Sequence, residues 1–105
     1  MIFIETRAFS RQVATLLSDK EYREMQEHLV ERPDAGAVIR GTGGIRKLRW
    51  AGEGHGKSGG VRVIYYWAIA KDRVLLLFMY PKNEKDDLSS EDRKTLRRIV
   101  EQEDK

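Results

Sequence analysis

The feature that most constrains the fold is a glycine-rich, basic loop with a strand-like segment on either side of it. The loop is Gly52–Gly60, and the flanking segments Ile45–Ala51 and Val61–Ile69 are rich in β-branched and aromatic residues. A third such segment, Val74–Tyr80, follows after a short turn at Lys71–Arg73. Consecutive strands joined by short connections pair with each other, so the middle of the chain predicts an antiparallel sheet.

Helices are expected before this region. Ile2–Ile4 is short and apolar and predicts a first strand, and apolar residues recur at helical spacing from Phe9 to Leu17. The segment Ser18–Glu21 has the pattern of a capping box, which predicts the start of a second helix that Pro33 closes. The two helices are therefore expected to form a helical hairpin on one face of the sheet.

A last helix is expected near the carboxyl end, with Ser89 or Ser90 as its cap and acidic residues in its first turn. The resulting order is β-α-α-β-β-β-α. With 105 residues and no linker or repeat, the chain predicts one small α+β domain over residues 1–105. Its sheet is expected to be antiparallel, with an N-terminal helical hairpin and a C-terminal helix.

Charge is distributed unevenly along the chain. The interval Arg40–Lys82 carries nine Lys or Arg and only two Asp or Glu, a formal charge of +7 within a chain of net charge +3. The remainder carries eleven Lys or Arg and fifteen Asp or Glu, a charge of −4. A basic sheet in an acidic surrounding is typical of a protein that binds a polyanion.

Composition excludes several classes of function. The chain has no cysteine, so it has neither a disulfide nor a thiolate metal site, and its two histidines lie far apart in sequence. No apolar run approaches the roughly 18–20 residues of a membrane span, and the first residues do not resemble a signal peptide. We therefore expect a cytoplasmic protein that works without a metal or another cofactor, and without a membrane.

The glycine-rich loop partly matches a phosphate-binding P-loop. A P-loop must lead into a helix whose amino end holds the phosphate, whereas Gly60 leads directly into a strand-like segment. Nucleotide hydrolysis is therefore disfavoured. The loop is better interpreted as a hairpin connection that presents Lys57, and with it His55, to an extended anion. His55 fits an exposed loop residue better than a general base.

Several cationic side chains are expected to converge on the sheet. Alternation places Arg46 on the side of Leu48, and places Lys47 and Arg49 together on the other side. Arg62 lies in the most apolar strand, where a buried guanidinium needs an anionic partner, and a phosphate would supply it. Tyr80, at the end of the last strand, is either a core residue or stacks on a base.

At these residues the chain resembles the RelE/ParE superfamily of toxins from bacterial type II toxin–antitoxin systems, most closely the HigB-like branch. Three ordered pieces carry the resemblance. They are Gly41–Arg49, Gly56–Tyr66, and Tyr80–Glu84 with Asp87–Ser89. The resemblance as a whole covers nearly the entire chain.

The resemblance implies a microbial-RNase-like fold and a ribosome-dependent mRNA endonuclease (an mRNA interferase) that inhibits translation. By analogy, the 2′-hydroxyl of mRNA in the ribosomal A site attacks the adjacent phosphate. The implied partners are a cognate antitoxin, the ribosome with its mRNA and, only through the antitoxin complex, operator DNA. The residues expected to be catalytic are Arg62, Lys47, Lys57, Tyr80 and Lys82, and those expected to bind RNA are Arg46, Arg49, His55 and Arg73.

Within this set the general base stays open between Lys47 and Lys57, because a lysine acts as a base only where neighbouring charge lowers its pKa. Several relatives carry a histidine near the carboxyl end, and this chain has none after His55. Two other functions fit the same sequence. One is a ParE-like inhibitor of DNA gyrase, and the other is a non-enzymatic module that binds RNA or the ribosome.

Overall fold

The computed structural model describes residues 1–51, 60–84 and 87–103. The predicted sites His55 and Lys57 lie outside these residues. Over the described part, the chain forms strands, three α-helices and a 3-10 helix. In order they are β1 (Ile2–Glu5), α1 (Arg7–Leu16), α2 (Asp19–Glu31), β2 (Ala37–Val38), β3 (Arg46–Trp50), β4 (Val61–Ala68), η2 (Ile69–Lys71), β5 (Arg73–Pro81) and α3 (Ser90–Glu103).

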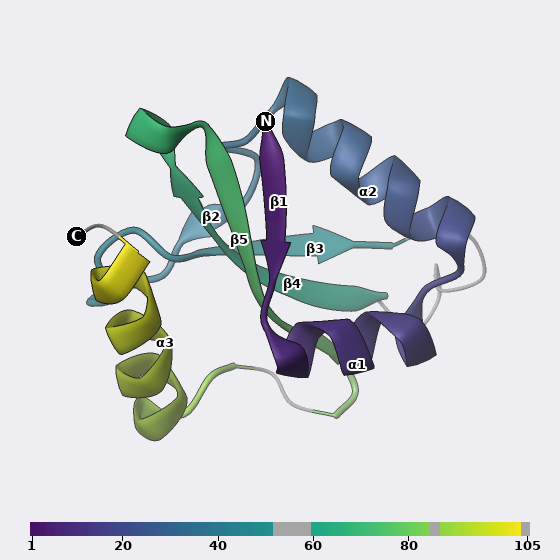
Figure 1. Cartoon of the computed structure of the whole chain (residues 1–105). Coiled ribbons are helices and arrows are strands. Elements are labelled where there is room, and N and C mark those ends of the chain that lie inside the picture. Colours follow the sequence, from purple (N-terminus) through teal and green to yellow (C-terminus); the bar gives the residue numbers. More distant parts are fainter. Residues whose placement is uncertain (52–59, 85–86, 104–105) are drawn as a thin grey trace.

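The strands form one five-stranded sheet in the order β1-β5-β4-β3-β2. The pairs β3–β4 and β4–β5 are antiparallel, as predicted, and β2–β3 is antiparallel as well, but β1 runs parallel to β5. The expected antiparallel sheet is thus corrected to a mixed one. The reason is topological, because α1 and α2 carry the chain from β1 across the sheet to its other edge (Figure 1). The short strand β2, which the sequence did not predict, forms that other edge.

Each face of the sheet has its own hydrophobic core. On one face, Phe9 and Val13 of α1 and Met25 and Leu29 of α2 pack on alternate residues of β3, β4 and β5. On the other face, α3 packs through Leu96 and Val100. The helical hairpin and α3 therefore lie on opposite sides of the sheet (Figure 1). The face that carries α3 is called the α3 face below.

The helix starts follow the local sequence. The Thr6 hydroxyl accepts a hydrogen bond from Phe9 N at 3.1 Å and donates one to Leu77 O at 2.7 Å, which fixes α1 to β5. Ser18 and Glu21 form the predicted capping box, with reciprocal bonds of 3.0 and 3.1 Å. Before α3, Ser89 and Asp92 exchange the same pair of bonds, each 3.1 Å, so Ser89 is the cap.

Two local irregularities distinguish β4 and β5 from the predicted hairpin. Instead of a tight turn at Lys71–Arg73, η2 joins the strands and Asp72 adopts a left-handed conformation with φ of 50°. Further along, the register shifts between Ile64 and Tyr65. The shift leaves one extra residue in β5, and both Leu77 and Phe78 consequently pack with the core on the α3 face.

None of the helices within the described ranges is both long and apolar enough to cross a membrane.

Candidate functional site

Three of the predicted site residues form a straight row across the sheet. Arg62 of β4 is paired with Arg49 of β3 on one side and with Tyr80 of β5 on the other. Side chains paired in this way have Cβ atoms about 4.5–5.5 Å apart. We refer to Arg49, Arg62 and Tyr80 as the Arg62 row.

The row lies on the α3 face. Val61 and Val63, the neighbours of Arg62 in β4, belong to the core under α1 and α2, so alternation directs Arg62 to the α3 face. Tyr80 belongs to the α3-side core itself. Arg62 is only 6% exposed, and its Nη1 lies 3.5 Å from Val61 O. The row thus runs from a buried phenol, through a buried guanidinium, to the exposed Arg49.

Lys47 lies beside the row on the same face. Lys47 is paired with Ile64, which is two residues from Arg62 along β4, so Lys47 is a diagonal neighbour of Arg62. Its side chain is 24% exposed, and its Nζ lies 3.9 Å from Asp87 Oδ1. Asp87 Oδ2 in turn accepts a hydrogen bond of 3.0 Å from Arg93 Nη2 on α3. The Asp87 carboxylate therefore links Lys47 of β3 to Arg93 of α3.

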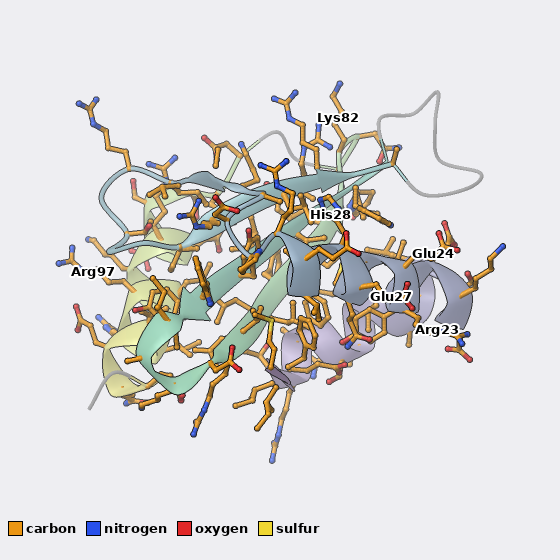
Figure 2. All side chains as sticks on the ribbon, turned by 90° about the horizontal axis from the view of Figure 1, so that it is seen from above. Arg23, Glu24, Glu27, His28, Lys82 and Arg97 are labelled. Atoms are coloured by element: carbon orange, nitrogen blue, oxygen red, sulfur yellow. The ribbon has the colours of Figure 1, made fainter. Side chains whose placement is uncertain are left out.

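Lys82 is fixed at the end of the sheet next to β4. Its backbone N–H donates to Gly60 O at 3.2 Å, which extends the β4–β5 ladder by one bond. Gly60 has φ of +67°, and a Cβ there would lie 2.2 Å from Trp50 O, so only glycine fits. The Lys82 side chain is exposed and projects from the body of the protein (Figure 2). Among the residues that the structure describes, neither Lys82 nor Arg49 has an ion-pair partner.

Two predicted RNA-binding residues lie elsewhere. Arg46 projects to the opposite face and donates from Nη1 to the carbonyls of Asp34, at 3.2 Å, and Gly36, at 2.8 Å. Arg73 lies at the far end of β5, where its Nη1 contacts Glu103 Oε1 at 2.8 Å. The structure thus brings five of the predicted residues to one end of the sheet: Lys47, Arg49, Arg62, Tyr80 and Lys82. Arg46 and Arg73 lie away from this group and contact backbone carbonyls and Glu103, respectively.

The sequence interpretation did not include Asp87 and Arg93 in the site. Asp87 immediately precedes the predicted start of the last helix, and Arg93 lies on the first turns of that helix. Both look like parts of a helix amino end in the sequence. Their link to Lys47 depends on how α3 packs on the sheet, which no local pattern encodes.

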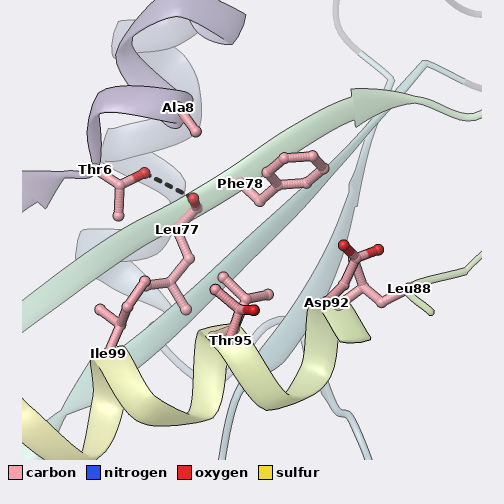
Figure 3. A pocket seen from close by; sticks show the side chains of 9 residues that line it. Thr6, Ala8, Leu77, Phe78, Leu88, Asp92, Thr95 and Ile99 are labelled. Atoms are coloured by element: carbon pink, nitrogen blue, oxygen red, sulfur yellow. Dashed lines mark hydrogen bonds between the residues drawn. The ribbon is translucent and has the colours of Figure 1, made fainter. Parts of the chain in front are cut away.

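A pocket of about 220 Å³ opens on the same face, between the start of α1, β5 and α3 (Figure 3). Its walls are mainly apolar and include Leu77, Leu96 and Ile99. Phe78 also lines it, and the Phe78 ring lies 5.9 Å from the Tyr80 ring, at an interplanar angle of 47°. The pocket therefore adjoins the Arg62 row without containing any of its cations.

Within the described ranges, no group of His, Asp or Glu side chains is arranged to hold a metal ion. The functional groups of the site are lysine ammonium groups, arginine guanidinium groups and the Tyr80 phenol. Its carboxylates are bound to cations or helix caps. Side chains of this kind can hold a phosphate group and stabilise negative charge that develops on it.

The fold and this arrangement define a class: a small α+β domain with a cationic row across a central sheet. The sequence profile described as RelE toxin of the RelE/RelB toxin–antitoxin system matches residues 2–104. The chain therefore belongs to the RelE toxin family. Its structure resembles that of a mutant of the Escherichia coli toxin RelE in the free state, with a TM-score of 0.61 and 16% sequence identity. The match covers 94% of this chain and 96% of the other. At this identity the structural likeness shows the shared fold.

Proposed function

We propose that this RelE-family toxin cleaves mRNA on the ribosome and belongs to the HigB-like branch of the superfamily. The observation that carries the proposal is the Arg62 row, with Lys47 beside it and Lys82 at the same end of the sheet. Five side chains of the kinds needed for phosphate binding and proton transfer are close together. A ParE-like inhibitor needs no such arrangement on its sheet.

The proposed reaction is the attack of an RNA 2′-hydroxyl on the adjacent phosphorus. A base removes the 2′ proton, the bond from O2′ to phosphorus forms, and the bond from phosphorus to O5′ breaks. An acid delivers a proton to the departing O5′. The products are a 2′,3′-cyclic phosphate and a 5′-hydroxyl. Negative charge accumulates on the non-bridging oxygens in the transition state, and fixed cations stabilise it there.

Arg62 is the residue proposed to hold the scissile phosphate. A planar guanidinium can donate two parallel hydrogen bonds to phosphate oxygens, and its location in a strand between two others limits its movement. Its burial lowers the local dielectric, which strengthens its interaction with a developing negative charge. Arg49 and Lys82 are exposed and suit the flanking phosphates of the strand.

Proton transfer is proposed for Tyr80 and for one of two lysines. Tyr80 is paired with Arg62 across β4 and β5, and its hydroxyl suits a donor to the leaving oxygen or a hydrogen-bond partner of the phosphate. The base remains either Lys47 or Lys57, and the latter lies outside the described residues. The ion pair from Lys47 to Asp87 gives Lys47 a competing partner in the free protein.

The test is to express the chain alone and map new RNA 5′ ends. We expect growth and translation to stop, with new 5′-hydroxyl ends inside translated regions and in register with codons. Co-expression of the gene product encoded next to the toxin should restore growth, because a RelE/RelB system pairs the toxin with an antitoxin. Intact mRNA together with double-strand DNA breaks would instead indicate gyrase as the target. Translation arrest with uncut mRNA would indicate a non-enzymatic ribosome-binding protein.

A further inference from the structure

We propose that Lys47 and Arg93 form a second phosphate-binding subsite, and that Asp87 occupies this subsite in the free toxin. The proposal rests on the proposed RNA cleavage, gives Lys47 a phosphate-binding role in place of that of the base, and adds a binding residue on α3, Arg93. The ligand is the phosphodiester next to the scissile one in the bound RNA strand. When the RNA binds, its phosphate replaces the Asp87 carboxylate.

The geometry is that of an anion site built from two distant parts of the chain. Lys47 comes from β3 and Arg93 from α3, yet both lie within 4.0 Å of one carboxylate. Nη2 of Arg93 is 3.0 Å from Asp87 Oδ2, and Nζ of Lys47 is 3.9 Å from Asp87 Oδ1. The two cations thus contact different oxygens of the same anion. A phosphodiester also presents two non-bridging oxygens that share a negative charge, so it can replace a carboxylate at this position.

The Asp87 carboxylate is held by the start of α3 as well as by the cations. Its Oδ1 accepts a hydrogen bond of 2.8 Å from Leu88 N, which leaves the longer contact to Lys47 as the weaker of its interactions. Asp87 is 53% exposed and Arg93 is 37% exposed, so solvent screens both ion pairs. The carboxylate is therefore displaceable from the cations without unfolding the helix.

Arg93 has capacity for a further acceptor. Its Nε is buried and has no hydrogen-bond partner among the residues that the structure describes. Its contact with Asp87 therefore uses one part of a fork that has five donors. A tetrahedral phosphate, with more acceptor positions than a carboxylate, would engage the guanidinium more completely after a small movement of the side chain.

The location suits a neighbouring phosphate of the same strand. Lys47 is the diagonal neighbour of Arg62 on the α3 face, at a Cα separation of about 7–8 Å for such positions. This is similar to the spacing of successive phosphates along an RNA strand. A strand whose scissile phosphate contacts Arg62 can therefore place the next one between Lys47 and Arg93.

The chain offers a matched control on the same helix. Arg97 and Glu101 form an exposed ion pair with Nε and Oε1 3.1 Å apart, and Arg97 lies well away from Lys82 (Figure 2). Arg97→Gln and Arg93→Gln remove the same charge from α3. Glu101→Gln and Asp87→Asn likewise remove the same negative charge. Any effect of overall charge is thereby common to both pairs.

The experiment measures single-turnover cleavage of mRNA on programmed ribosomes at increasing toxin concentration. We expect Asp87→Asn to lower the half-saturating concentration roughly two- to fivefold, the size expected for release from an exposed ion pair, without changing the maximal rate. Arg93→Gln should raise the half-saturating concentration and make it less dependent on salt, because one phosphate contact is lost. Arg97→Gln and Glu101→Gln should stay close to the wild type. If Asp87→Asn melts at a lower temperature than the wild type, Asp87→Ser replaces it in the experiment, because the serine hydroxyl keeps an acceptor for Leu88 N.

Three results would overturn the subsite. The first is that Asp87→Asn and Asp87→Ser match Glu101→Gln in half-saturating concentration. The second is that Arg93→Gln matches Arg97→Gln. The third is that these variants change antitoxin affinity alone, which would assign the two cations to an acidic segment of the antitoxin. A wild-type protein that cuts no mRNA would refute the proposed function itself, and the subsite with it.

Discussion

Arg62 and Tyr80 are paired directly across β4 and β5, and both are almost completely buried, at 6% and 3% exposure. A charged guanidinium is rarely buried to this degree unless other groups compensate for its lost hydration. Here it lies at the end of the α3-side core, between a phenol and the exposed Arg49. Arg62 therefore both packs in the core and is proposed to bind the phosphate, and substitutions can separate these two roles.

Replacement of Arg62 tests the phosphate assignment. Arg62→Lys keeps the positive charge and much of the apolar stem but loses the planar fork. We expect it to melt near the wild-type temperature, and to lose about 10²–10³ in single-turnover cleavage rate, as for the removal of one preorganised donor. Arg62→Ala should lose at least as much activity and also some stability, because its buried stem is removed. Arg62→Lys with wild-type cleavage would end the phosphate assignment.

Tyr80 can be tested by removing a single oxygen. Tyr80→Phe preserves the ring that packs against Phe78, so stability should change little. If the hydroxyl transfers a proton or binds the phosphate, cleavage should slow by about 10²–10⁴ at neutral pH. Tyr66→Phe, in β4 but on the same face of the sheet as Tyr80, is the matched control and should cut at the wild-type rate. Equal rates for the two variants would place Tyr80 in the core alone.

The local parts of the fold were predictable because they depend on neighbouring residues. The Ser18–Glu21 capping box, the two successive helices and the common face of Lys47 and Arg49 all follow from spacing and alternation. Contacts between distant segments were not predictable in this way. The parallel pairing of β1 with β5 depends on how the helices carry the chain across the sheet.

The same limit applied to the site. The basic strands indicated that cations would gather, but the register that aligns Arg49, Arg62 and Tyr80 depends on the ladders as a whole. The positive charge of Arg46 also did not reveal that this residue lies outside the cationic site. Arg46 contacts the carbonyls of a loop from a distant part of the sequence, and a count of positive residues does not reveal such a partner.

Tyr65 provides a test of stability away from the proposed site. Its hydroxyl donates to Pro33 O and accepts from Gly36 N, both at 2.8 Å. Tyr65→Phe leaves these two groups without that partner and should lower the free energy of unfolding by about 1–3 kcal/mol. Chemical denaturation measures the change. Cleavage by the folded variant should equal that of the wild type, and a selective loss of activity would show that this loop shapes the site.

The same hydroxyl predicts a loss of stability at alkaline pH. Burial raises the pKa of Tyr65 above its ordinary value, and it also raises the pKa of Tyr22, with a further contribution from Glu5. A pKa that is higher in the folded state means that the neutral phenol favours folding. That contribution is complete below the unfolded-state pKa of about 10 and is lost as pH rises through the folded-state pKa. Melting temperature measured across this range should fall less steeply in Tyr22→Phe and Tyr65→Phe than in the wild type.

Association with the antitoxin provides the last test, since a RelE/RelB system supplies such a partner. The exposed cations Arg49 and Lys82 are expected to attract an acidic or amphipathic antitoxin segment and to accelerate its encounter with the toxin. Arg49→Gln and Lys82→Gln should then lower the association rate and weaken its dependence on salt. Arg23→Gln removes the same charge from α2 and is the control, because Arg23 is exposed and lies away from Lys82 (Figure 2). Stopped-flow measurements at several salt concentrations give these rates. If all three variants slow association equally, the toxin's overall charge steers the antitoxin, and the site cations have no special part in it.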